Sequence, residues 1–183
     1  MHTPTRGGRY VPITILPHPA LGEAFQRAAA LAMAFGFGYI MQTQKGMYVK
    51  DGILCVEATR AGVPAFTFEI GEGGRLETDL VPLGVRCVCN ALRFLGMLSG
   101  VPEPPSETVV MRQFVGVRAT RGGLLHTVAK LGARVQPGDV LARIYSLYGD
   151  ERETIRAPCA GTFIRMTTFA SVAAGERVAT LGV

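Results

Sequence analysis

The feature that most constrains the fold is a proline-rich segment near the middle of the chain. Three prolines lie within residues 101–107, and residues without a backbone N–H are excluded from helix interiors and central strands. Before this segment the sequence predicts mainly helices, and after it mainly short strands and turns. We therefore expect two domains, residues 1–100 and 108–183, joined by a linker over 101–107.

Composition indicates a globular protein with a substantial core. Hydrophobic residues make up 48% of the chain and charged residues 18%. The net charge of +5 comes from scattered Lys and Arg residues, so it predicts no nucleic-acid partner, although it suits an anionic small molecule. The apolar run over 28–39 is short and broken by glycine, which argues against a membrane span. The N-terminus has no signal-peptide pattern and the cysteines are expected to be reduced, so we expect a cytoplasmic protein.

The first domain alternates predicted strands and helices, which is typical of an α/β fold. Apolar spacing predicts a helix over 19–35, a short helix over 51–61 capped by Asp51, and a long helix that Thr78 or Asp79 caps. Short strands are expected over 11–16, 39–41 and 65–68.

The predicted strand over 65–68 delivers a carboxylate, Glu69, followed by glycines at 71, 73 and 74. Ligands of open α/β sheets bind outside the carboxyl ends of strands, so Glu69 is a candidate general base. The alternative interpretation is a solvated loop glutamate. Glu72, three residues further on, is the second candidate carboxylate.

The second domain contains a repeated turn pattern. Val135-Gln136-Pro137-Gly138-Asp139 and the later Gly175-Glu176 pair predict tight turns between short strands. With Ala157-Pro158 and Gly161 between them, they resemble the half-barrel of biotinyl and lipoyl carrier domains. The hairpin over 145–153 lacks the lysine that such carriers modify, so a swinging-arm carrier is not expected.

The segment Phe66-Thr67-Phe68-Glu69-Ile70-Gly71 resembles the motif of the catalytic glutamate in the succinylglutamate desuccinylase/aspartoacylase family. These are zinc-dependent deacylases, similar in fold to zinc carboxypeptidases. Met1-His2-Thr3-Pro4 is similar to the family's Asp-x-His-Thr element, whose histidine is a zinc ligand. The resemblance therefore implies that His2 is a metal ligand and Glu69 the catalytic base, and it covers nearly the whole chain.

One departure from the family pattern is large. The family's other zinc ligands form a His-x-x-Glu motif, which is absent from this sequence. The resemblance then implies a partial zinc-carboxypeptidase-like α/β/α sheet domain followed by a small all-β half-barrel domain. We expect a truncated member of the family, inactive as an isolated chain. The alternative is a non-catalytic fragment or subunit without a complete zinc site.

The resemblance also implies what the family's chemistry would be here. Zinc would activate a water, and Glu69 would transfer its proton in the hydrolysis of a small N-acyl amino acid or a similar compound. Arg6, Arg9 and Tyr148 are candidate substrate-binding residues, with surface or packing roles as the alternative. If the chain is truncated, it lacks strands that the N-terminal part of the family adds to the same sheet, which would expose a sheet edge and apolar surface. We therefore expect a homo-oligomer or association with a missing N-terminal segment.

Overall fold

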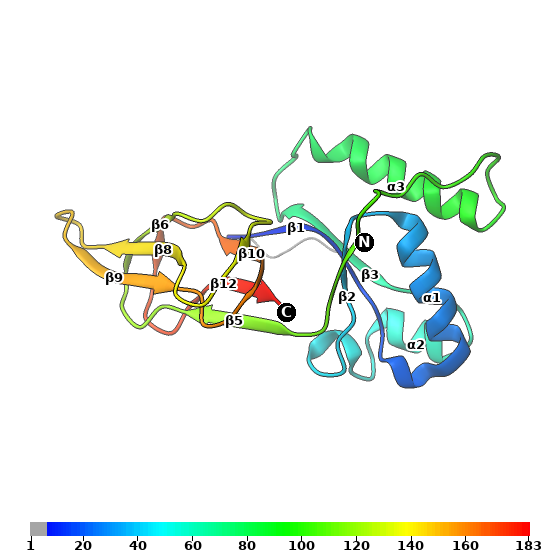
Figure 1. Cartoon of the computed structure of the whole chain (residues 1–183), viewed down its shortest axis with the longest axis horizontal. Coiled ribbons are helices and arrows are strands. Elements are labelled where there is room, and N and C mark those ends of the chain that lie inside the picture. The colour runs from blue at the N-terminus through cyan, green and yellow to red at the C-terminus, as the bar shows by residue number, and fades with distance from the viewer. Residues whose placement is uncertain (1–6) are drawn as a thin grey trace. The chain divides into compact units, whose positions relative to one another are not determined.

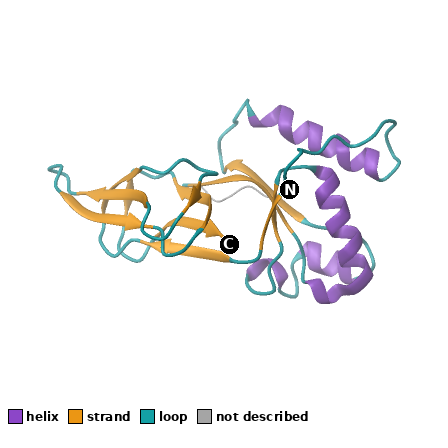
Figure 2. Ribbon diagram, in the orientation of Figure 1, coloured by secondary structure: helices purple, strands orange, loops and turns teal. Residues whose placement is uncertain are grey.

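The computed structural model of the chain describes residues 7–183, which divide into two compact units. The first unit comprises Pro12–Gly71 and Arg75–Gln113. The second comprises the described residues up to Val11, together with Glu72–Gly74 and Phe114–Val183. The helices of the described chain all belong to the first unit, whereas the second is built of strands and loops (Figure 2).

The first unit is built on parallel strands. The end of β1 (Gly8–Ile15) pairs in parallel with β2 (Tyr39–Met41), and β2 pairs in parallel with β4 (Val109–Met111). The strand β3 (Thr67–Glu72) also pairs with β1. Parallel neighbours require a crossover connection, which α1 (Gly22–Phe35) supplies between β1 and β2 (Figure 1). The predicted α/β character of this part of the chain is confirmed.

Helices were predicted in the right places, but their first turns differ. A 3₁₀ turn, η1 (Pro19–Leu21), precedes α1, and a second, η2 (Met47–Val49), follows β2. The predicted cap at Asp51 is wrong, because α2 (Leu54–Arg60) begins after Ile53. The Asp51 carboxylate instead contacts the Arg60 guanidinium at 2.5 Å, so an ion pair replaces the expected cap.

Two apolar clusters hold the helices of the first unit against its strands. Phe25 and Ala32 of α1 pack with Leu16 and with Ile40 of β2. The end of α1 meets α3 (Leu80–Phe94) and β3 in a second cluster, whose buried centre is Phe35, Phe37 and Cys87. The rings of Phe35 and Phe37 pack edge to face, with 4.8 Å between their centroids.

The second unit contains two sets of antiparallel strands. In one set, β10 pairs with the start of β1, with β7 and with β12, and β12 pairs with β5. In the other, the order is β11-β6-β8-β9. The bounds of these strands are β5 (Phe114–Arg118), β6 (Gly123–Thr127), β7 (Arg134–Val135), β8 (Val140–Tyr145), β9 (Glu151–Arg156), β10 (Gly161–Thr167), β11 (Ser171–Val172) and β12 (Arg177–Gly182).

One apolar core stabilises this unit, and two similar turns connect its strands. Leu141, Ile144 and Leu181 are fully buried in the core. In the turn before β8, Gly138 has a φ of 92° and the Asp139 carboxylate accepts the Gln136 N–H at 2.7 Å. The turn before β12 repeats this arrangement, since the Glu176 carboxylate accepts the Ala173 N–H at 2.5 Å. The two tight turns predicted from the Gly-Asp and Gly-Glu pairs are therefore confirmed.

No helix within residues 7–183 combines the length and the apolar character that crossing a membrane requires.

Candidate functional site

Glu69 lies inside a strand rather than beyond its end. The sequence predicts a strand over 65–68 with Glu69 following it, whereas β3 runs from Thr67 to Glu72. Phe68 and Ile70 pack in the apolar cluster around Phe35. Because successive side chains of a strand point to opposite faces, Glu69 points away from that cluster. Its exposed fraction is 1%, so the strand holds a carboxylate in the interior.

A tyrosine contacts this buried carboxylate. The hydroxyl of Tyr48 donates a hydrogen bond to Glu69 Oε1. A buried charge is costly unless it is hydrogen-bonded, so this contact helps to offset the burial of Glu69. A hydrogen bond from a neutral donor also orients the carboxylate. Glu69 and Tyr48 therefore form a buried carboxylate–phenol pair within the first unit.

Tyr48 reaches Glu69 from the loop that leaves the carboxyl end of β2. It belongs to η2, between glycines at 46 and 52 that both have positive φ. At the start of the loop, the Thr43 hydroxyl accepts the Lys45 N–H at 3.1 Å and donates to the Lys45 carbonyl at 2.8 Å. The loop was predicted, but nothing in the local sequence identifies the tyrosine as a partner of Glu69.

Gly71 shapes the chain just beyond the glutamate. Its φ of 70° lies in the left-handed region, which favours glycine. A Cβ at this position would lie 3.0 Å from Glu77 Oε1 and 3.3 Å from Leu80 Cδ1. Gly71 therefore lets the end of β3 approach the start of α3 closely.

Glu72, the second candidate carboxylate, has a contact within the second unit. Its exposed fraction is 8%, and its Oε1 accepts a hydrogen bond from the Thr168 hydroxyl at 2.7 Å. This bond joins residues 96 apart in the sequence. The simplest role for Glu72 is structural, because its hydrogen bond joins two distant segments of the chain. Glu69 is therefore the stronger candidate for a catalytic carboxylate.

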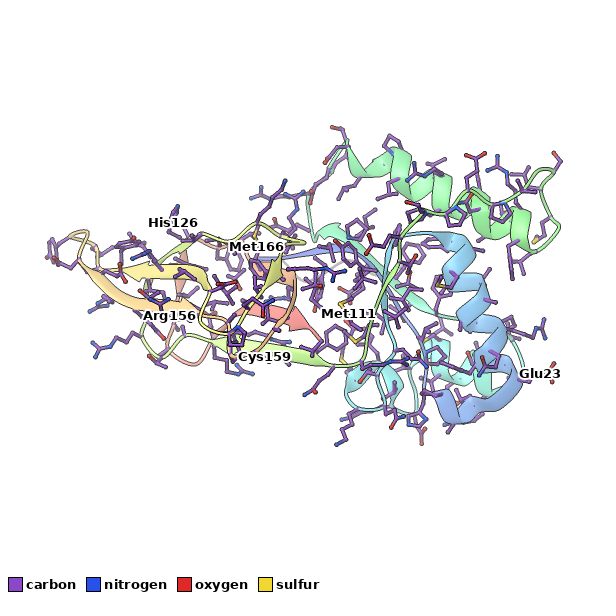
Figure 3. The ribbon with its side chains drawn as sticks, viewed as in Figure 1. Glu23, Met111, His126, Arg156, Cys159 and Met166 are labelled. Atoms are coloured by element: carbon purple, nitrogen blue, oxygen red, sulfur yellow. The ribbon has the colours of Figure 1, made fainter. Side chains whose placement is uncertain are left out.

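The predicted metal ligand His2 lies outside the described residues, and the other two histidines have ordinary surroundings. His18 Nδ1 accepts the Ala20 N–H at 3.0 Å and so caps η1. His126 is exposed on β6, paired in register with Arg143, and its ring projects from the strand (Figure 3). Among residues 7–183, no three His, Cys, Asp or Glu side chains lie where they could share a metal ion. The described residues thus do not supply the three ligands of a catalytic zinc.

The candidate substrate-binding residues occupy different positions. Arg6 lies outside the described residues. Arg9 is half-buried on β1, in register with Met166 of β10. Tyr148 lies in the turn between β8 and β9 with an exposed fraction of 94%. The described residues define no ligand-binding site around Arg9 or Tyr148. The substrate-binding roles of all three residues therefore stay predictions.

The four cysteines are free thiols, as expected. Cys87 is buried between α3 and the end of α1, and its thiol donates to the Gly36 carbonyl with a sulfur–oxygen distance of 3.6 Å. Burial raises the pKa of the Cys87 thiol, which disfavours the nucleophilic thiolate. Cys87 is therefore a packing residue and not a candidate nucleophile.

Solved structures with the same fold cover this chain almost completely. The apo ectoine utilization protein EutE (DoeB) from Ruegeria pomeroyi matches with a TM-score of 0.85 and 25% identity, over 100% of this chain and 58% of that chain. A succinylglutamate desuccinylase from a Silicibacter species matches with a TM-score of 0.83 and 21% identity, over 99% and 56%. A succinylglutamate desuccinylase/aspartoacylase from Rhodobacter sphaeroides matches with a TM-score of 0.79 and 20% identity, over 98% and 56%.

The chain thus spans somewhat more than half the length of the solved structures that it matches. No protein-family model matches the sequence, and no curated protein matches it either. The similarity is therefore carried by the fold more than by the sequence.

Proposed function

We propose that this chain, which belongs by its fold to the succinylglutamate desuccinylase/aspartoacylase family, carries the general base of a deacylase. The reaction is hydrolysis of the amide bond of a small N-acyl amino acid or a similar compound. The observation that carries this proposal is the buried Glu69 carboxylate, which a strand holds in place and which Tyr48 contacts.

Glu69 has the properties that a general base needs in this reaction. Its carboxylate accepts a proton from the water that attacks the acyl carbonyl and then donates that proton to the leaving amine. The rigid position of Glu69 in β3 limits the reorientation that this transfer would otherwise require. Tyr48 acts as a positioning residue, because its hydroxyl holds one carboxylate oxygen and so directs the other.

The same fold comparison and the charge support the proposed substrate class. The net charge of +5 favours an anionic substrate, such as the carboxylate of an N-acetyl or N-succinyl amino acid. One of the similar structures is an ectoine utilization protein, so ectoine-related N-acyl compounds belong in the first panel of substrates. Arg6, Arg9 and Tyr148 are the proposed substrate-binding residues.

Zinc is the proposed metal, with His2 as one ligand. The described residues 7–183 contain no cluster of three possible metal ligands. We therefore assign no step of the reaction to a metal ion. The proton transfers through Glu69 form the part of the reaction that the described geometry supports.

The test compares two carboxylate variants in the same assay. Amine release from N-acetyl and N-succinyl amino acids is measured for the purified chain, with Zn²⁺ added, and for Glu69→Gln and Glu72→Gln. We expect Glu69→Gln to lower turnover at least about a hundredfold, the usual effect of losing a general base, while Glu72→Gln retains turnover. Full turnover by a folded Glu69→Gln variant would contradict the proposal.

A further inference from the structure

Three neighbouring strands of the second unit carry arginines without acidic residues. The strands β5, β10 and β12 contain Arg118, Arg165 and Arg177 and no Asp or Glu, and β12 pairs with both of the others (Figure 1). In the other set of strands, by contrast, Arg143 contacts Glu151. Within the part of the chain that the structure describes, neither Arg118 nor Arg177 contacts a carboxylate. These two arginines face each other in register, and like charges in that arrangement favour a nearby anion.

The arginines share one face of the sheet with a buried threonine. Met166 and Leu181 pack in or against the apolar core of the unit. Because side chains alternate along a strand, Arg165 and Thr180 point to the opposite face. Thr180 lies in register with Arg165 on one side and with Gly116 on the other. We define the arginine face as Arg118, Arg165, Arg177 and Thr180.

Two of the arginine side chains flank Thr180. From β10, Arg165 Nη1 donates to the Arg177 carbonyl at 3.3 Å, so its guanidinium reaches the backbone of β12. On the other side, Arg177 Cδ lies 3.3 Å from the position that a Cβ of Gly116 would occupy. The Arg177 side chain therefore runs over β5 towards the residue opposite Thr180. Gly116 leaves the room for this path, because it has no side chain.

The hydroxyl of Thr180 has no partner in the described chain. Thr180 is 0% exposed, and its Oγ1 has no hydrogen-bond partner among the described residues. A buried hydroxyl without a partner is unfavourable. An anion held by the flanking guanidinium groups would accept its hydrogen bond. A carboxylate carries one negative charge, whereas a phosphate carries about two near neutral pH and so matches two guanidinium groups.

We propose that the arginine face binds a tetrahedral oxyanion of the phosphate class, with Arg165 and Arg177 as its charged ligands and the Thr180 hydroxyl as a further donor. The distribution of charge supports this site. Phe114–Val183 contains nine Lys or Arg residues against five Asp or Glu, whereas residues 12–71 and 75–113 of the first unit contain eight of each. The positive field that attracts anions therefore originates in the second unit. The site requires neither Glu69 nor the proposed hydrolysis.

The first experiment titrates the purified chain with inorganic phosphate by isothermal calorimetry at constant ionic strength, with acetate as the comparison anion. We expect a dissociation constant of about 1 mM for phosphate and binding at least about tenfold weaker for acetate. Arg177→Gln should weaken phosphate binding about tenfold, because it removes a charged donor. Arg152→Gln is the matched control, since Arg152 is an exposed arginine of the same unit that donates to the Gly122 carbonyl at 2.9 Å. Circular dichroism verifies that the variants are folded.

Thr180→Val separates ligand binding from a structural role. Valine has nearly the shape of threonine without the hydroxyl, so the variant should be at least as stable to heat while phosphate affinity falls about fivefold. Phosphate should also raise the Tm of the unaltered chain, as any ligand of the folded state does. Phosphoserine that binds more tightly than phosphate would support a phosphorylated small molecule as the ligand, and the reverse order would support free phosphate.

Three results would each overturn the proposal. The first is phosphate that binds no more tightly than acetate. The second is phosphate binding that Arg177→Gln leaves unchanged. The third is a Thr180→Val variant that loses thermal stability but keeps its phosphate affinity, because Thr180 would then serve the fold alone.

Discussion

At the scale of single residues, the segment around Glu69 combines a rigid carboxylate with a glycine that no other residue replaces easily. Glu69 is 1% exposed within β3. Two residues later, the positive φ of Gly71 and the 3.0 Å distance from its Cβ position to Glu77 Oε1 exclude a side chain. Packing therefore explains the glycine, and the buried glutamate beside it is the residue to which we assign the proposed chemistry.

The hydroxyl of Tyr48 is expected to contribute to turnover through Glu69. Tyr48→Phe removes one hydrogen bond to a carboxylate, which contributes about 1.5 kcal/mol, so kcat should fall by about tenfold with KM unchanged. Steady-state kinetics that separate kcat from KM provide the measurement.

Tyr39→Phe is the control for the Tyr48 variant, since Tyr39 is a half-buried tyrosine on β2 of the same unit. Equal losses of kcat in both variants, or a loss in Tyr48→Phe that appears only in KM, would assign Tyr48 a purely structural role.

Sequence reasoning named Glu69 as a candidate but did not find the tyrosine that contacts it, for a physical reason. The glutamate sits in a local pattern of apolar residues and glycines. The hydrogen bond to Tyr48 joins residues 21 apart, and it depends on how the loop after β2 folds back. Local periodicity contains no information about such a contact. The same limit applies to Glu72, whose partner Thr168 is far away in the sequence.

At the scale of elements, periodicity predicted which segments are helices better than how they begin. The helix α1 and the strand β2 lie where apolar spacing places them. The cap at Asp51 was wrong, because α2 begins after Ile53 and the Asp51 carboxylate contacts Arg60 instead. For α3, apolar spacing predicted the helix but does not separate residues that pack in the unit, such as Cys87, from exposed ones, such as Val85.

The turns before β8 and β12 should depend on their acidic residues. In Asp139→Ala the Gln136 N–H loses its acceptor, so unfolding of the chain should become easier by about 1 kcal/mol. Glu176→Ala should have a similar effect, because its carboxylate accepts the Ala173 N–H in the same way. Urea denaturation measures both, and Asp139→Asn, which keeps an acceptor oxygen, is the control. An unchanged midpoint in Asp139→Ala would show that the glycine alone forms the turn.

At the scale of the whole molecule, the question is where a metal could be held. The sequence contains three histidines, and a catalytic zinc takes three protein ligands. His18 already uses Nδ1 to cap η1, and His126 is exposed on β6 of the second unit. The described residues contain no three-ligand cluster. A zinc site in this chain would therefore need ligands beyond those that the described residues bring together.

We accordingly expect the purified chain to retain far less than one zinc per molecule after gel filtration, and any hydrolysis to require added Zn²⁺. Elemental analysis of the protein gives the metal content, and the amine-release assay with and without a chelator gives the dependence. His18→Ala and His126→Ala should change neither quantity, whereas His2→Ala should remove whatever zinc remains. A full equivalent of zinc that disappears in the His18 or His126 variant would contradict this reasoning. It would mean that one of these two histidines is a zinc ligand.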